Sequence, residues 1–265
     1  MRMDLHLKDK VVWIVGGSTG IGYACAKSLL LEGAKVAISS RDEHKLSLAA
    51  RQLYEETETC PLVISADAND PVGMEETFRN IIENFGGLNI LIYSAGISKH
   101  GKLMELEPED WKKNWELNIV SFFRTVKLIV PELKKAGGGS IAVLGASSGK
   151  QPTPNQLISN TTKGSLLPMV KTLAEELAPD NILINNICPG RFLTTRRYDI
   201  AKMEEEKRGV SFEDYINEVA ETVPLKRLGD PEEIADFISF IVSPKGSYIT
   251  GQSISVDGGL IRSII

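Results

Sequence analysis

The fold is decided by the stretch VVWIVGGSTGIG, residues 11–22. Its first part, Val11–Val15, is apolar and rich in β-branched side chains, which predicts a strand buried on both faces. The strand runs directly into a turn with the spacing G-x-x-x-G-x-G, formed by Gly16, Gly20 and Gly22. A turn of this kind, followed by a helix over Gly22–Glu32, leaves backbone N–H groups open toward a pyrophosphate. We therefore expect these residues to open a nucleotide-binding α/β sheet.

Short β-branched runs alternate with longer amphipathic segments through the rest of the chain. The expected strands are Val36–Ser39, Leu62–Ser65, Ile90–Tyr93, Ile141–Leu144, Leu183–Cys188 and Ser253–Val256. The expected helices are Glu43–Thr57, Val72–Phe85, Glu109–Lys135, Asn155–Leu177 and Pro231–Val242, with Pro168 expected to kink or divide the fourth. The alternation predicts an α/β, Rossmann-type doubly wound parallel sheet of about seven strands with helices on both faces. We see no linker or repeat and expect a single domain over residues 1–265.

The composition excludes several classes of partner. A formal net charge of −5 over 265 residues gives no basic surface for nucleic acid or an anionic membrane. No apolar run approaches the ~18 residues that a membrane-spanning helix needs. Residues 1–6 lack the apolar core of a signal peptide, which favours a cytoplasmic protein. The cysteines and histidines are few and scattered, so we expect no metal site.

The end of the second expected strand bears on the choice of cofactor. An NAD site has an acidic residue at this place, which binds the ribose hydroxyl, whereas an arginine accommodates the 2′-phosphate of NADP. Here the strand ends in Ser40 and Arg41. The sequence therefore predicts that NADP(H) is preferred over NAD(H).

Further motifs follow in a fixed order along the chain. They are Ser94-Ala95-Gly96, Asn118 within Glu116-Leu117-Asn118-Ile119-Val120, Lys163, Pro189-Gly190 through Thr194, Pro224-Leu225 with Arg227-Leu228-Gly229, and Thr250-Gly251-Gln252 with Asp257-Gly258-Gly259. Together with the glycine turn, this order resembles the short-chain dehydrogenase/reductase superfamily, in particular its 3-oxoacyl-carrier-protein-reductase-like branch. The resemblance covers essentially the whole chain and implies an oxidoreductase that binds a nicotinamide dinucleotide.

The resemblance also implies which residues hold the cofactor. Asp67 would contact the adenine, the segment from Pro189 to Thr194 would embrace the nicotinamide carboxamide, and Ser94 stands where the family has asparagine. The full set implied to bind the cofactor is Gly16, Ser18, Thr19, Gly20, Ile21, Gly22, Ser40, Arg41, Asp67, Ala68, Ser94, Ala95, Gly96, Lys163, Pro189, Gly190, Phe192 and Thr194.

The catalytic residues of the family are only partly present. The family uses asparagine, serine, tyrosine and lysine, and here Asn118 and Lys163 match the first and the last. Ser159 occupies the position of the tyrosine, four residues before the lysine, and Ala146 occupies that of the serine. Ser147 lies next to Ala146, but adjacent side chains of an extended segment point in opposite directions, so it is not an automatic substitute. The candidate catalytic residues are therefore Lys163, Asn118 and Ser159.

Three functions remain open on this evidence. The first is an NADP(H)-dependent oxidoreductase acting on a carbonyl or an alcohol, with a proton donor that is Lys163, a water held by Asn118 and Lys163, or a tyrosine from elsewhere, Tyr93 or Tyr198. The second is a conjugate reductase of enones, in which the Lys163 cation stabilises an enolate. The third is a catalytically degenerate cofactor-binding protein. Loss of a general acid lowers rates by about 10²–10⁴ without abolishing hydride transfer.

An insertion over Thr194–Thr222 is polar and helical in pattern. We expect a two-helix lid over a small-molecule substrate, with apolar side chains facing the pocket. These side chains are Phe192, Tyr198, Met203, Phe212 and Tyr215. The family resemblance further implies a homotetramer or a homodimer that uses the helices expected at 109–135 and 155–177.

Overall fold

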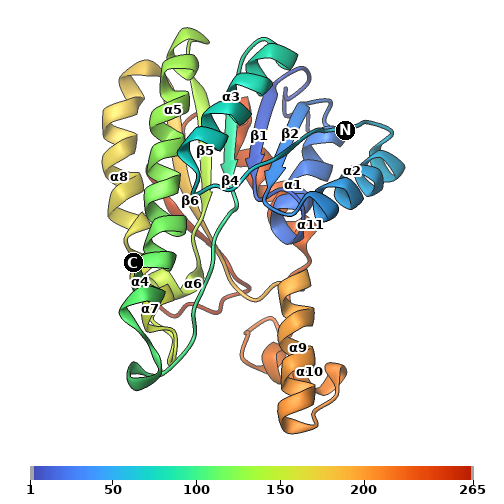
Figure 1. Ribbon diagram of the computed structural model, residues 1–265, viewed down its shortest axis with the longest axis vertical. Coiled ribbons are helices and arrows are strands. Elements are labelled where there is room, and N and C mark those ends of the chain that lie inside the picture. Colours follow the sequence, from blue (N-terminus) through green and yellow to red (C-terminus); the bar gives the residue numbers. More distant parts are fainter. Residues whose placement is uncertain (1–2, 264–265) are drawn as a thin grey trace.

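The computed structural model describes residues 3–263 and has a seven-stranded parallel sheet at its centre (Figure 1). The strand order is β3-β2-β1-β4-β5-β6-β7. The strands are β1 (Val11–Val15), β2 (Lys35–Ser40), β3 (Leu62–Ser65), β4 (Ile90–Tyr93), β5 (Gly139–Leu144), β6 (Ile182–Pro189) and β7 (Ser253–Val256). Each paired neighbour runs parallel. The predicted doubly wound α/β fold is confirmed.

Helices cover both faces of the sheet because successive strand side chains point to opposite sides. In β1, Val12 and Ile14 belong to one apolar cluster, whereas Trp13 and Val15 belong to the other. The first cluster is completed by α1 (Gly20–Leu31), α2 (Glu43–Thr57) and α11 (Pro231–Val242). The second is completed by α3 (Pro71–Phe85), α5 (Ser121–Lys135) and α8 (Leu166–Leu177). β1 and β4 are therefore apolar throughout, as the sequence pattern predicted.

Two of the expected helices are divided, one of them near Pro168 as the sequence predicted. The segment 109–135 consists of α4 (Pro108–Trp115), a π-helical segment at Glu116–Val120, and α5. The segment 155–177 consists of α7 (Leu157–Gly164) and α8. Pro168 lies in the first turn of α8, where its missing N–H group costs no intrahelical bond. It thus resets the helix boundary rather than kinking the helix.

The segment after β6 forms two helices that project beyond the carboxyl ends of the strands (Figure 1). These are α9 (Thr195–Arg208) and α10 (Phe212–Glu221). The rings of Tyr198 and Phe212 stack at 5.0 Å, and Arg208 binds Glu218 across the pair at 2.6 Å. The short helical turns elsewhere are α6 (Ser147–Lys150), Leu103–Glu105, Ala178–Asp180 and Pro244–Gly246.

Within residues 3–263, no helix has both the length and the apolar character needed to cross a bilayer. The same residues contain no group of three or more His, Cys, Asp or Glu side chains that could hold a metal ion.

Candidate active site

A cavity of about 500 Å³ lies along the carboxyl ends of the six strands β1 to β6. The ends of parallel strands meet at one edge of the sheet, and ligands bind there at the point where the strand order reverses, between β1 and β4. The volume is in the range of small-molecule sites. Of the residues expected to hold the cofactor, all but Gly22 and Phe192 line this cavity.

The glycine turn between β1 and α1 forms one wall of the cavity. Gly16 has φ +85°, and a Cβ atom there would lie 2.8 Å from the backbone nitrogen of Ala95. Thr19 is the N-cap residue of α1, and its side chain makes no capping bond, so the first N–H groups of the helix remain available to an anion. Gly22 itself does not line the cavity. A Cβ atom there would lie 2.2 Å from the Gly16 carbonyl oxygen, so this glycine allows close packing of helix and turn.

The end of β2 presents two hydroxyls and a guanidinium. Ser18 Oγ donates to Ser40 Oγ at 3.0 Å, and Arg41 lines the cavity beside them. The next residue in the sequence, Asp42, carries a carboxylate. Its Oδ1 atom accepts a hydrogen bond from the backbone nitrogen of Lys45 at 3.0 Å and caps α2. It is therefore not placed as the ribose acceptor of an NAD site.

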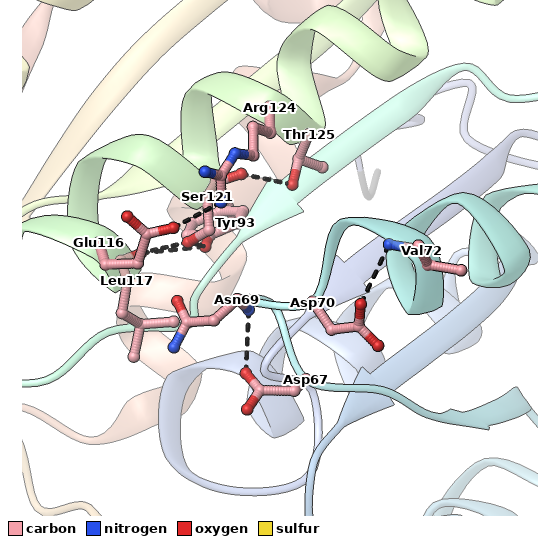
Figure 2. A network of polar contacts seen from close by, with 10 residues as sticks. All are labelled: Asp67, Asn69, Asp70, Val72, Tyr93, Glu116, Leu117, Ser121, Arg124 and Thr125. Carbon is pink, nitrogen blue, oxygen red and sulfur yellow. Dashed lines mark hydrogen bonds and ion pairs between the residues drawn. The ribbon is translucent and has the colours of Figure 1, made fainter. Parts of the chain in front are cut away.

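Asp67 lies at the end of β3, on the wall of the cavity. Its Oδ1 atom accepts from the backbone nitrogen of Asn69 at 2.9 Å, which fixes the turn before α3 (Figure 2). Asp70 then caps α3 by accepting from the nitrogen of Val72 at 3.1 Å. These local bonds explain why the chain turns sharply at the cavity and how the carboxylate of Asp67 is held in place.

Only part of the segment after β6 lines the cavity. Pro189, Gly190 and Thr194 line the cavity. Phe192 does not line the cavity, and its contact with the cofactor stays a prediction. Its ring is 7% exposed and belongs to the apolar core, where a Cβ atom on Gly229 would lie 2.6 Å from it. The ring therefore anchors this segment to the body of the protein.

Lys163 reaches the cavity wall from α7 and is 8% exposed. Its Nζ atom donates to the Leu144 carbonyl oxygen at 2.9 Å. Burial lowers the pKa of Lys163 from 10.5 to about 8, and the nearby charge of Arg196 acts in the same direction. The ammonium form thus predominates at neutral pH, yet it can release a proton readily.

Asn118 lies in the π-helical segment, behind the cavity wall. Its Oδ1 atom accepts from the backbone nitrogen of Ile97 at 3.0 Å, and its Nδ2 atom donates to the carbonyl oxygen of Ile97 at 2.9 Å. A Cβ atom on Gly96 would lie 2.9 Å from Asn118 Oδ1 and 3.0 Å from Lys163 Nζ. The structure thus brings Asn118 and Lys163 close together. Asn118 binds the loop after β4 and does not line the cavity.

The two substituted positions of the family pattern both face the cavity. Ser159 is 3% exposed and lines the cavity. Ala146 is the N-cap residue of α6, so the segment is not extended beyond it as we assumed. Ser147 and Ser148 begin the helical turn and line the cavity, and Ser148 Oγ is buried without a partner in the described chain.

Neither tyrosine that we considered as a proton donor lines the cavity. Tyr93 is 1% exposed and points away into the sheet–helix interface, where its hydroxyl lies 2.7 Å from Ser121 Oγ and donates to the Leu117 carbonyl oxygen at 3.1 Å (Figure 2). Burial raises the pKa of Tyr93. Tyr198 is 44% exposed and stacks on Phe212 in the projecting helices. Each ring is used for packing.

The structure brings together a group of basic residues to which the sequence assigned no role. Arg191, Arg196, Arg197 and His100 line both this cavity and an adjoining one of about 710 Å³. The adjoining cavity lies between the loop after β4 and helices α9 and α10. One signal was available: consecutive arginines in the first turn of an expected helix, where the helix dipole disfavours positive charge.

Comparisons with known proteins agree with this architecture. A family model described as enoyl-(acyl carrier protein) reductase matches residues 15–261. Human dehydrogenase/reductase SDR family member 4 is 33% identical over 256 residues, 96% of this chain and 88% of the relative. The 3-oxoacyl-[acyl-carrier-protein] reductase FabG of Vibrio cholerae is 31% identical over 257 residues, 97% of this chain and 99% of the relative.

Solved structures give the same result. L-sorbose reductase from Gluconobacter frateurii, complexed with NADPH and L-sorbose, superposes with a TM-score of 0.94 at 35% identity, over 99% of this chain and 100% of that one. A variant of actinorhodin polyketide ketoreductase with NADPH gives a TM-score of 0.90 at 26% identity, over 96% and 98% of the two chains. The fold and the cavity define an NAD(P)-dependent oxidoreductase. The chain belongs to the short-chain dehydrogenase/reductase superfamily, with relatives in its 3-oxoacyl-carrier-protein-reductase-like branch.

Proposed function

We propose that this protein is an NADP(H)-dependent oxidoreductase that interconverts a carbonyl and an alcohol, with Lys163 as the proton donor. One observation carries the proposal. Burial lowers the pKa of Lys163 to about 8 at the cavity wall, whereas no tyrosine within residues 3–263 lines that cavity. The general acid of such a reaction is most effective when its pKa lies near the working pH.

The residues present fit NADP(H). The glycine turn and the uncapped start of α1 suit a pyrophosphate, and the arrangement of Ser18, Ser40 and Arg41 suits a 2′-phosphate. Similar structures have been solved as NADPH complexes, which supports the same assignment. When bound, the reduced nicotinamide supplies the hydride for carbonyl reduction.

The lysine supplies the proton in this proposal. Its bond to Leu144 O orients the amine, and the remaining N–H bonds of the ammonium are free to reach a substrate oxygen. The ammonium donates one proton to the oxygen of the carbonyl as that oxygen gains negative charge, and the resulting neutral amine regains a proton from water. In alcohol oxidation the neutral amine accepts the proton. Ser159 is shorter than tyrosine by roughly a phenyl ring, so the substrate oxygen can approach the lysine directly.

The test is NADPH oxidation by the purified protein with a pool of ketones that includes L-sorbose, across pH 6 to 10. Because reduction needs the ammonium form, kcat/KM should fall as the pH rises through about 8, and Lys163→Met should remove at least about 100-fold of the rate. Lys150→Met is the matched control, because Lys150 Nζ also donates to a backbone carbonyl, that of Ser253 at 3.2 Å, but does not line the cavity. A pH-independent rate would remove Lys163 as the donor.

An Ala146→Ser/Ser159→Tyr double variant completes the experiment. If the natural sequence is inactive on every substrate and the double variant is active, the cofactor frame is intact and the degenerate cofactor-binding function is favoured. If both are active and Tyr198→Phe changes nothing, the proposal for Lys163 stands.

Conjugate reduction is the second candidate, favoured by the description of the matching family model as enoyl-(acyl carrier protein) reductase. Hydride addition to the far carbon of an enone leaves an enolate oxygen, which the Lys163 cation would stabilise. A pool of α,β-unsaturated ketones, assayed beside the saturated ketones, separates the two. Turnover of saturated ketones alone would exclude this candidate.

A further inference from the structure

Three arginines converge on the two adjoining cavities without a counter-ion. Arg191 follows β6, and Arg196 and Arg197 lie in the first turn of α9. All three line both cavities. Among residues 3–263, none of them has a carboxylate within ion-pair distance, whereas Arg208 at the other end of α9 binds Glu204 and Glu218. Within the described residues the three arginines therefore form no ion pair with the chain itself.

The guanidinium groups are also incompletely hydrogen-bonded. Arg197 Nη1 donates to Tyr215 Oη at 2.9 Å, and Arg196 Nη2 donates to the Ser98 carbonyl oxygen at 3.2 Å. The Nε atoms of Arg191 and Arg197 are buried and have no partner in the described chain. A buried donor without a partner is costly, so such atoms mark a place where a ligand or water is expected.

The electrostatic effect of this arrangement appears in the pKa values of the basic groups. Burial and the charge of Arg197 lower the pKa of both Arg191 and Arg196. Burial and the three arginines lower the pKa of His100. Helix α9 has no acidic residue in its first turn, and its N-cap residue Thr194 makes no side-chain capping bond. The helix dipole thus adds to the positive potential.

We propose that Arg191, Arg196 and Arg197 bind an anionic group of the substrate, a carboxylate or a phosphate, beside the carbonyl that is reduced. Planar guanidinium groups suit both anions, because they donate in pairs. The inference rests on the proposed function, since it names the substrate class of the same site. It restricts the substrates to keto acids, hydroxy acids or phosphorylated ketones and alcohols.

The arginines line both cavities, and only the adjoining cavity is distinct from the glycine turn and the end of β2. The adjoining cavity is lined by all three arginines and by Ser98 and His100, but by no residue of the glycine turn or of the end of β2. Its acidic side chains are Asp199, Glu204 and Glu218, of which the last two bind Arg208. Two of these three carboxylates are thus directed to Arg208, and within residues 3–263 none of the three forms an ion pair with Arg191, Arg196 or Arg197.

The first part of the test is a calorimetric titration of the NADP⁺-saturated protein with oxalate and, separately, with inorganic phosphate. Arg196→Gln and Arg197→Gln should each weaken the binding of at least one anion by about tenfold or more. Lys202→Gln is the matched control, because it removes one positive charge from the exposed side of the same helix, and it should leave binding unchanged. The two probes distinguish a carboxylate site from a phosphate site.

Three results would overturn the inference: neither anion binds, the control loses as much affinity as the arginine variants, or the arginine variants lose affinity for NADPH instead of the anion. The second part compares turnover of matched pairs, a 2-oxo acid against its methyl ester and a phosphorylated ketose against the free sugar. Equal kcat/KM within both pairs would refute the inference and leave the proposed function intact. If NADPH does not bind at all, the proposed function fails, and titration of the cofactor-free protein with the same anions still decides the arginine site.

Discussion

At position 163 the fold buries an amine that most proteins leave in water. The folded state holds its pKa near 8, below the usual 10.5, so the unfolded chain binds the proton more tightly. A group of this kind destabilises the folded protein below pH 8, and the penalty disappears as the pH rises to about 10.5. The difference corresponds to about 3 kcal/mol.

Lys163→Met should therefore stabilise the cofactor-free protein. The variant loses the bond to Leu144 O, which offsets about 1 kcal/mol, so the net gain at pH 7 is about 2 kcal/mol. Urea denaturation at pH 7 and pH 10 measures the free energy of unfolding, and the advantage of the variant should shrink between the two. A variant less stable than the natural protein at pH 7 would contradict the account of the lysine given above.

Gly96 is a second residue at which one added carbon atom would change the geometry of the site. An added Cβ would approach Asn118 Oδ1 at 2.9 Å and Lys163 Nζ at 3.0 Å, and the flexible lysine can move more easily than the anchored asparagine. Gly96→Ala should thus displace the ammonium and lower kcat/KM by about tenfold or more. Gly87→Ala is the control, since its Cβ would meet only Glu132 Oε1 at 3.6 Å. An unchanged pH–rate profile in Gly96→Ala would argue against a positioned Lys163.

At the scale of elements, the π-helical segment between α4 and α5 ties the loop after β4 to the helices. Asn118 satisfies both backbone groups of Ile97, and removing its side chain leaves them unpaired. Asn118→Ala should cost about 2 kcal/mol of unfolding free energy and weaken NADPH binding through the loop. Asn84→Ala removes bonds that lie within α3 and should cost less than about 0.5 kcal/mol. Equal losses in the two variants would refute the special role of the segment.

The elements themselves were largely predictable from the sequence because strands such as β1 and β4 are continuous apolar runs. Pro168 also indicated the division between α7 and α8. The division at the π-helical segment was not predictable, because Asn118 there binds the carbonyl oxygen of Ile97, which lies far away in the sequence. Motif position also does not say whether a side chain such as that of Phe192 faces the cavity or the core. The clustering of Arg191 with Arg196 depends on the direction in which α9 leaves the sheet.

At the scale of the whole molecule, the cavity belongs to the entire sheet. Six of its strands contribute their carboxyl ends, so a ligand bound there links segments far apart in the sequence. The expected homotetramer or homodimer stays a prediction. Its proposed helices carry exposed apolar rings, Trp115 at 41% and Phe123 at 47%.

Because NADPH would bind in a cavity formed by the ends of six strands, it should raise the temperature of unfolding of the whole chain in one transition. At about 100 times its Kd the added stability is about 2.7 kcal/mol. NADH lacks the 2′-phosphate that Arg41 would meet, so the same concentration should stabilise less. Arg41→Ala should reduce the effect of NADPH to that of NADH, whereas Arg51→Ala, on the exposed side of α2 and paired with Glu55, should preserve the difference. Calorimetric scans of the three proteins with each cofactor decide this. Equal shifts with NADPH and NADH in the natural protein would reject the preference for NADP(H), because the guanidinium at the end of β2 would then contribute nothing to binding.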